Sequence, residues 1–236
     1  MSRSASTLAD TDARLLDNIF WSALTGAQAG LAVGAGGARR YAPGFSPIVG
    51  FEQPEQPDLA SLRPYCESGE QFYCDQWMGP APADWLVLKE ARMHRMIWQG
   101  DRPTPRGSER AKALGLAHAP AAVALAALTN PGPFGPRTLE MGDYFGIFDE
   151  DRLIAMAGER VEAGRLREIS GVCTHPEYRG GGLARLLTEL LVERQLRRGQ
   201  IPFLHVMSAN EAALKLYESM GFVRYRETPV RVIAAR

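Results

Sequence analysis

The spacing of apolar positions changes abruptly near residue 180. Residues 166–174 have the composition of a buried strand, a run of glycines follows, and leucines then recur at helical spacing at Leu183, Leu186, Leu187, Leu190 and Leu191. This pattern predicts a strand, a glycine-rich turn and an amphipathic helix that buries its leucine face. The first N–H groups of a helix have no intrahelical partners, so the turn is suited to bind a phosphate.

Similar patterns occur on both sides of this unit. Strands are expected at 85–98, as one long or two consecutive segments, and at 144–148, 153–161, 201–207 and 222–233. Helices are expected at 15–24, at 119–129 and after Ser208, where Ser208 and Glu211 fit a capping box. The region between the helix at 15–24 and the strand at 85–98 is interrupted by Pro43, Pro47, Pro54 and Pro57, which predicts turns and short edge strands there.

Composition narrows the class of protein. The chain has 236 residues, 45% of them hydrophobic, and its 27 Lys and Arg balance its 27 Asp and Glu. The hydrophobic content is sufficient for a buried core. The balanced charge argues against a nucleic-acid partner, because such proteins more often have an excess of basic residues. No run of eighteen apolar residues and no signal-peptide core is present, so we expect a cytoplasmic protein without a membrane span.

Three cysteines, Cys66, Cys74 and Cys173, lack the paired spacing of a zinc site. Reduced thiols are the economical interpretation, and no metal site is expected.

The glycine turn, Arg179-Gly180-Gly181-Gly182-Leu183-Ala184, excludes two common phosphate loops. No Lys-Ser or Lys-Thr pair follows the glycines, and the spacing G-x-G-x-x-G is absent. Neither a Walker loop nor a Rossmann fingerprint is therefore present.

The pattern Arg-x-x-Gly-x-Ala at 179–184 instead resembles the coenzyme-A loop of the GNAT superfamily of N-acetyltransferases. Other features occur in the same order as in that family: Val172-Cys173-Thr174 in the strand before the loop, His175 to Tyr178 leading into it, Asn210 and Tyr217 on the next helix, and Gly221-Phe222 at its end. The resemblance covers about residues 143–233. It implies an α/β fold with a mixed sheet and helices on both faces, and acetyl-CoA as co-substrate.

The resemblance also implies site residues. Backbone groups of Val172, Cys173 and Thr174 would contact pantetheine, and the loop from Arg179 through Gly180, Gly181, Gly182, Leu183 and Ala184 would hold the pyrophosphate, with Asn210 near the cofactor.

The first half of the chain resembles, more weakly, the extra half of the glycine-N-acyltransferase-like branch. That resemblance rests on Asp17-Asn18 through Trp21 and on Arg39-Arg40-Tyr41. It predicts a degenerate GNAT-like copy at 1–90 and a catalytic domain at 91–236. A plain amino-terminal extension is the other interpretation.

Two residues are candidates for proton transfer. Strand alternation places Glu168 on the face of Val172 and Thr174, where a carboxylate could deprotonate the acceptor; the other interpretation is an exposed glutamate at a strand start. Tyr217 could protonate the leaving thiolate, because its unperturbed pKa is near 10, or it could pack between Leu214 and Met220. His205 is a further possible base, although a lone histidine in an apolar strand is more often hydrogen-bonded core.

These features predict an acetyl-CoA-dependent N-acetyltransferase that works by direct attack in a ternary complex, as a monomer or homodimer. Cys173 is expected on the face opposite Val172 and Thr174, which argues against an acylated intermediate. The acceptor would be a small-molecule or peptide amine. A non-catalytic acyl-CoA-binding module is the second hypothesis.

Overall fold

The computed structural model describes residues 8–236. Its helices are α1 (Asp10–Asp17), α2 (Ile19–Thr25), α3 (Leu59–Leu62), α4 (Ala119–Thr129), α5 (Leu183–Arg197) and α6 (Glu211–Met220). Its strands are β1 (Ala32–Val33), β2 (Ala38–Tyr41), β3 (Val49–Phe51), β4 (Gln71–Asp75), β5 (Trp85–Trp98), β6 (Lys112–Ala113), β7 (Tyr144–Asp149), β8 (Arg152–Ala163), β9 (Leu166–Thr174), β10 (Ile201–Met207) and β11 (Phe222–Ala235).

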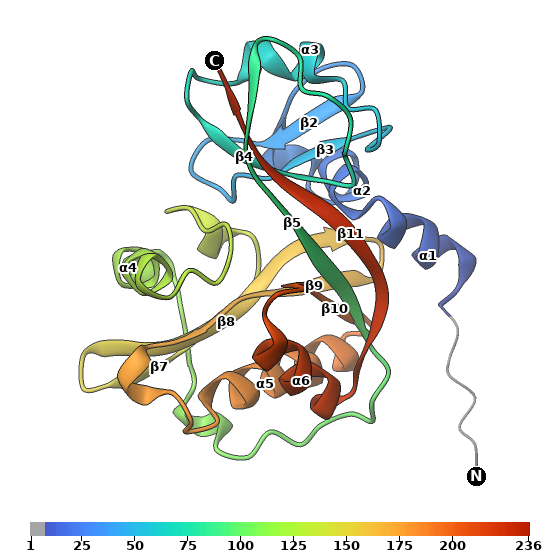
Figure 1. Ribbon diagram of the computed structural model, residues 1–236. Helices are drawn as coiled ribbons and strands as arrows, with labels where there is room; N and C mark the ends of the chain where they lie inside the picture. The colour runs from blue at the N-terminus through green and yellow to red at the C-terminus, as the bar shows by residue number, and fades with distance from the viewer. Residues whose placement is uncertain (1–7) are drawn as a thin grey trace.

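The main sheet has the order β4-β11-β5-β10-β9-β8-β7-β6, and β1, β2 and β3 form a separate antiparallel sheet (Figure 1). Neighbours in the main sheet are antiparallel except β9 and β10, which are parallel. The expected mixed α/β sheet is therefore confirmed. The segment 85–98, which the sequence left open, is one continuous strand.

Helices cover both faces of this sheet because the strands in its middle bury residues on both sides. On β10, Leu204 packs with the leucines of α5, whereas Phe203 packs with α1 and α2. A third cluster lies under α4 and includes Cys173. Figure 1 shows α5 and α6 together beneath the sheet, with α4 at its side.

The amino-terminal region is joined to the main sheet by hydrogen bonds. β4 pairs with β11, and β5 continues through residues 90 and 91, where the sequence placed a domain boundary. Figure 1 shows β5 and β11 running side by side toward the small sheet. The expected helix at 15–24 is divided at Asn18 into α1 and α2. That residues 1–90 are a degenerate GNAT copy stays a prediction.

Candidate active site between β9, β10 and α6

The glycine turn enters α5 with its backbone open to solvent. Gly180 and Gly182 have φ angles of 82° and 74°, in the left-handed region that glycine adopts without strain. A Cβ added at either position would meet no atom within 4 Å. The first helical bond is donated by the N–H of Leu186 to the carbonyl of Gly182, so earlier N–H groups have no such partner. An open turn of this kind fits the pyrophosphate that the sequence predicts here.

β9 and β10 separate after a short paired section. Their parallel register runs from Leu166 opposite Ile201 only to Glu168 opposite Phe203, although β9 continues to Thr174 and β10 to Met207. Gly171, at a φ of 64°, lies where the register of β9 against β8 shifts. Within residues 8–236 the backbone at 172–174 therefore has no partner strand on the β10 side, which leaves it available for the pantetheine contact that the resemblance implies.

The same bulge reverses the alternation of side chains along β9. Ile169 and Val172 are three residues apart, yet both pack with the α5 cluster, whereas Cys173 lies under α4. Glu168 instead contacts Arg160 and His205, and the ring of His205 stacks on Phe20 of α2. The prediction that Glu168 shares a face with Val172 is therefore wrong. The bulge inserts one extra residue into β9, so residues before and after it no longer follow a single alternation between the two faces.

A cavity of about 240 Å³ lies at the separation of the two strands. Its wall includes Val172 of β9, the segment 205–207 of β10, Asn210 just before α6, and Tyr217 of α6. Strands β4, β5 and β11 and the loop after α4 complete it, through Asp75, Lys89, Val230 and residues 130–133. Three of the site residues expected from the sequence thus meet at one cavity: Val172, Asn210 and Tyr217.

The hydroxyl of Tyr217 is free at this cavity. The side chain is 8% exposed, and its ring packs edge-on against Phe222 with centroids 5.8 Å apart. Within residues 8–236 no hydrogen-bond partner of the hydroxyl is found. Burial raises the pKa of Tyr217 to about 12, so the phenol keeps its proton at neutral pH.

Asn210 caps α6 and also faces the cavity. Its Oδ1 accepts a hydrogen bond from the N–H of Ala213 at 3.2 Å. The capping box expected at Ser208 is therefore wrong by two residues, and the Ser208 hydroxyl instead donates to Glu227. Both interpretations of Asn210, as helix start and as cavity residue, are compatible with this position.

Glu168 is fully buried and forms an ion pair. Arg160 donates to its two oxygens at 2.9 and 2.7 Å, and His205 Nδ1 lies 2.7 Å from Oε1. Burial alone would raise the pKa of Glu168, but the charge of Arg160 and hydrogen bonds from His205 and Arg160 lower it to about 2. The expectation of an exposed glutamate at a strand start is wrong. A carboxylate with so low a pKa has little affinity for the proton of an ammonium group.

Both ring nitrogens of His205 form hydrogen bonds. Arg95 Nε donates to its Nε2 at 3.1 Å, so Nδ1 carries the proton that is donated to Glu168. The ring stacks on Phe20 with centroids 5.2 Å apart, and burial lowers the pKa of His205. The hydrogen-bonded core position expected for a lone histidine is confirmed.

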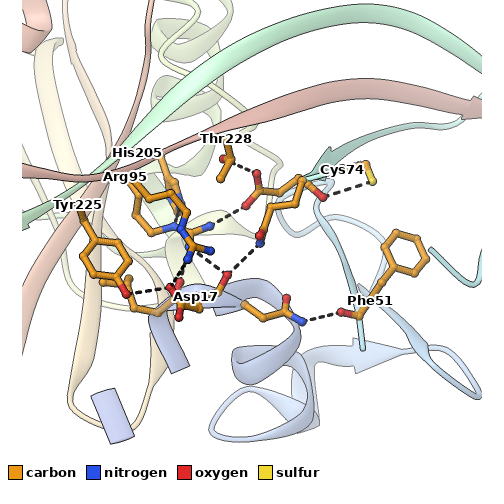
Figure 2. A network of polar contacts seen from close by, with 12 residues as sticks. Asp17, Phe51, Cys74, Arg95, His205, Tyr225 and Thr228 are labelled. Atoms are coloured by element: carbon orange, nitrogen blue, oxygen red, sulfur yellow. Dashed lines mark hydrogen bonds and ion pairs between the residues drawn. The ribbon is translucent and has the colours of Figure 1, made fainter. Parts of the chain in front are cut away.

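Figure 2 shows the network continuing beyond His205. Arg95 is fully buried and donates to Asp75 at 2.6 Å, and the hydroxyl of Thr228 donates to the same carboxylate at 2.6 Å. Arg95 also donates to the carbonyl of Leu16. The sequence offered one signal for this network, namely single charged residues inside apolar strands.

Comparison with known proteins places the chain in a family. A family model described as FR47-like protein matches residues 144–232. A solved GNAT-family protein from Novosphingobium aromaticivorans is 34% identical, covers 94% of this chain and 98% of its own, and superposes with a TM-score of 0.85. This chain belongs to the GNAT family of acetyltransferases.

Shorter matches connect this GNAT chain to curated relatives. A mycothiol acetyltransferase of Thermomonospora curvata is 38% identical over 88 residues, which are 35% of this chain and 29% of that protein. The N-alpha-acetyltransferase RimI of Mycobacterium tuberculosis is 43% identical over 58 residues, which are 24% of this chain and 35% of that protein. The chain thus aligns with about a third or less of these curated relatives.

Two further findings concern the described residues alone. No group of three or more potential metal ligands occurs within residues 8–236. No helix in the same range is long and apolar enough to cross a membrane.

Proposed function

We propose that this protein is an N-acetyltransferase that transfers the acetyl group of acetyl-CoA to a primary amine by direct attack. The observation that carries the proposal is the free hydroxyl of Tyr217 at the cavity where β9 and β10 separate, beside Val172. This arrangement provides a proton donor and an unpaired strand backbone at a cavity of about 240 Å³.

Coenzyme A would be held by backbone groups on either side of the cavity. The pyrophosphate would lie on the N–H groups of the turn from Arg179 to Ala184, where the α5 dipole favours negative charge. Pantetheine would extend along 172–174, whose backbone has no strand partner on the β10 side. Asn210 would contact the cofactor from the start of α6.

The reaction follows from these positions. The acceptor ammonium first loses a proton to water, and the neutral nitrogen attacks the thioester carbonyl carbon, which forms the C–N bond. The C–S bond then breaks, and the thiolate takes the proton of the Tyr217 hydroxyl. The nitrogen loses its second proton, which returns to Tyr217 through water. The products are the amide, free coenzyme A and one proton released to solvent.

Within this proposal, Glu168 positions the site and water removes the first proton. Both oxygens of Glu168 already accept hydrogen bonds, and both ring nitrogens of His205 are engaged. Neither group is free to act as a base in this arrangement.

Thiol release from acetyl-CoA in the presence of a panel of small amines and peptides, with mass spectrometry of the products, tests the proposal. We expect an acetylated product, and protection against thermal unfolding of about 2.7 kcal/mol at a hundred times Kd. Protection without any acetylated product would favour the second hypothesis, a non-catalytic acyl-CoA-binding module. Absence of both would contradict the proposal.

A further inference from the structure

In the described part of the chain, the charged residues of the cavity wall are paired with one exception. Asp75 is paired with Arg95 at 2.6 Å, and Arg160 is paired with Glu168 at 2.7 Å. His205 is held neutral, because burial lowers its pKa. Lys89 is the remaining charged residue of the wall, and it has no ion-pair or hydrogen-bond partner within residues 8–236. The cavity therefore carries one uncompensated positive charge.

Strand register fixes where that charge lies. Lys89 of β5 is opposite Val232 of β11, which is opposite Tyr73 of β4. Side chains of directly opposed residues project to one face of a sheet, so Lys89 belongs to the face that lines the cavity. Lys89 is exposed, which places it at the cavity opening.

The next set of opposed residues on these three strands lies between Lys89 and the inner end of the cavity. Ala91 is opposite Val230, and Val230 is opposite Asp75, one pleat further along the same face. Ile48 lies against these strands and also lines the cavity. The path from the opening to the split between β9 and β10 therefore passes the aliphatic side chains of Ile48, Ala91 and Val230, beside the carboxylate of Asp75.

We infer that the acceptor is a primary amine with a carboxylate at the far end of an apolar body, as in an ω-amino acid. The inference rests on the proposed function and names its substrate class. The carboxylate would lie at Lys89, the apolar body against Ala91 and Val230, and the amino group near Tyr217. A second cation, as in a diamine, would be repelled by Lys89.

The pairing of the other charges agrees with this class of acceptor. A free carboxylate near the reacting nitrogen would hold the acceptor as an ammonium ion, which cannot attack. The carboxylate of Asp75 is instead neutralised by Arg95. The cavity thus binds an anion at its opening without stabilising the protonated amine at its inner end.

Matched acceptors test the inference. The ω-amino acids 6-aminohexanoate and 8-aminooctanoate are compared with pentylamine and heptylamine, which lack only the carboxylate, by kcat/KM with acetyl-CoA. Binding of each compound in the presence of coenzyme A is measured separately by calorimetry. The proteins are the parent, Lys89→Gln and Lys89→Glu, with Lys112→Gln as a control that removes the same charge from β6, outside the cavity wall.

We expect the parent to prefer each amino acid over its decarboxylated partner. Lys89→Gln should lower that preference about fivefold or more, and Lys89→Glu should reverse it, whereas Lys112→Gln should leave it unchanged. Equal use of both partners by the parent, or an unchanged preference in Lys89→Gln, would overturn the inference while acetyl transfer stands. Selective binding of the amino acids without turnover would support the inference and contradict the proposed function. If the amino acids are neither bound nor turned over, the inference is overturned.

Discussion

Nδ1 of His205 lies 2.7 Å from Oε1 of Glu168, and this contact joins the last paired residue of β9 to a residue just beyond the paired section of β10. Glu168 of β9 also forms an ion pair with Arg160, and His205 of β10 accepts a hydrogen bond from Arg95. The strands separate immediately beyond this point. The buried network thus fixes the geometry at the inner end of the cavity.

Replacement of Glu168 by glutamine should destabilise the fold. It leaves Arg160, whose side chain is only 7% exposed, without a charged partner, and breaking a buried pair costs about 3–5 kcal/mol. Urea unfolding measures the loss. Glu218→Gln is the control, because Glu218 pairs with Arg224 at the surface and should change the free energy of unfolding by at most ~1 kcal/mol. Equal effects of the two variants would contradict the role given to Glu168.

The effect of Glu168→Gln should also depend on pH. The folded pKa of Glu168 is lowered from 4.5 to about 2, so the carboxylate contributes stability above the unfolded pKa and loses it as pH falls through the folded pKa. The difference in unfolding free energy between parent and variant should therefore shrink between pH 4.5 and about 2. A difference that is constant across this range would mean that the ion pair is not its source.

A positioning role for Glu168 makes a kinetic prediction as well. If Glu168 does not accept the acceptor's proton, Glu168→Gln lowers kcat/KM by about the same factor at every pH, because the ionisation that controls the rate is unchanged. Profiles of kcat/KM against pH for parent and variant, at temperatures where both remain folded, provide the test. Recovery of the variant at high pH would instead identify Glu168 as the base.

A carboxylate in the glycine turn should prevent coenzyme binding. Gly182→Asp introduces a Cβ and a negative charge where the pyrophosphate would lie, so affinity for acetyl-CoA should fall at least tenfold. Gly199→Asp is a matched control: Gly199 has a φ of 70°, close to the 74° of Gly182, and it follows the other end of α5 with equally open surroundings. Both variants should lose similar stability, but only Gly182→Asp should lose affinity in calorimetry. Similar affinities in the two variants would place the phosphates elsewhere.

The strand, turn and helix around residue 180 could be predicted because local spacing determines them. Leucines at helical intervals and glycines at left-handed positions specify the element and its start without reference to the rest of the chain. Asn210 and Tyr217 were predicted from the family resemblance and not from local spacing; the structure places both at the cavity wall, and their roles stay predictions.

The direction of Glu168 could not be predicted from alternation, because the bulge at Gly171 depends on how β9 meets β8. A glycine inside a strand was the available signal. The pairing of Arg95 with Asp75 could not be predicted from the sequence for a different reason. The two residues lie on β5 and β4, which are not neighbours but are both paired with β11, and this order is decided by tertiary packing.

The turnover of Tyr217→Phe tests the central claim most directly. The substitution removes only the hydroxyl and keeps the ring contact with Phe222, so thiolate protonation would depend on water and kcat should fall on the order of a hundredfold. The KM for acetyl-CoA should change little. Tyr225→Phe, which removes a hydroxyl bonded to Asp17 outside the cavity wall, is the control and should keep the parental kcat. A parental kcat in Tyr217→Phe would contradict the assignment of Tyr217 as the acid that protonates coenzyme A.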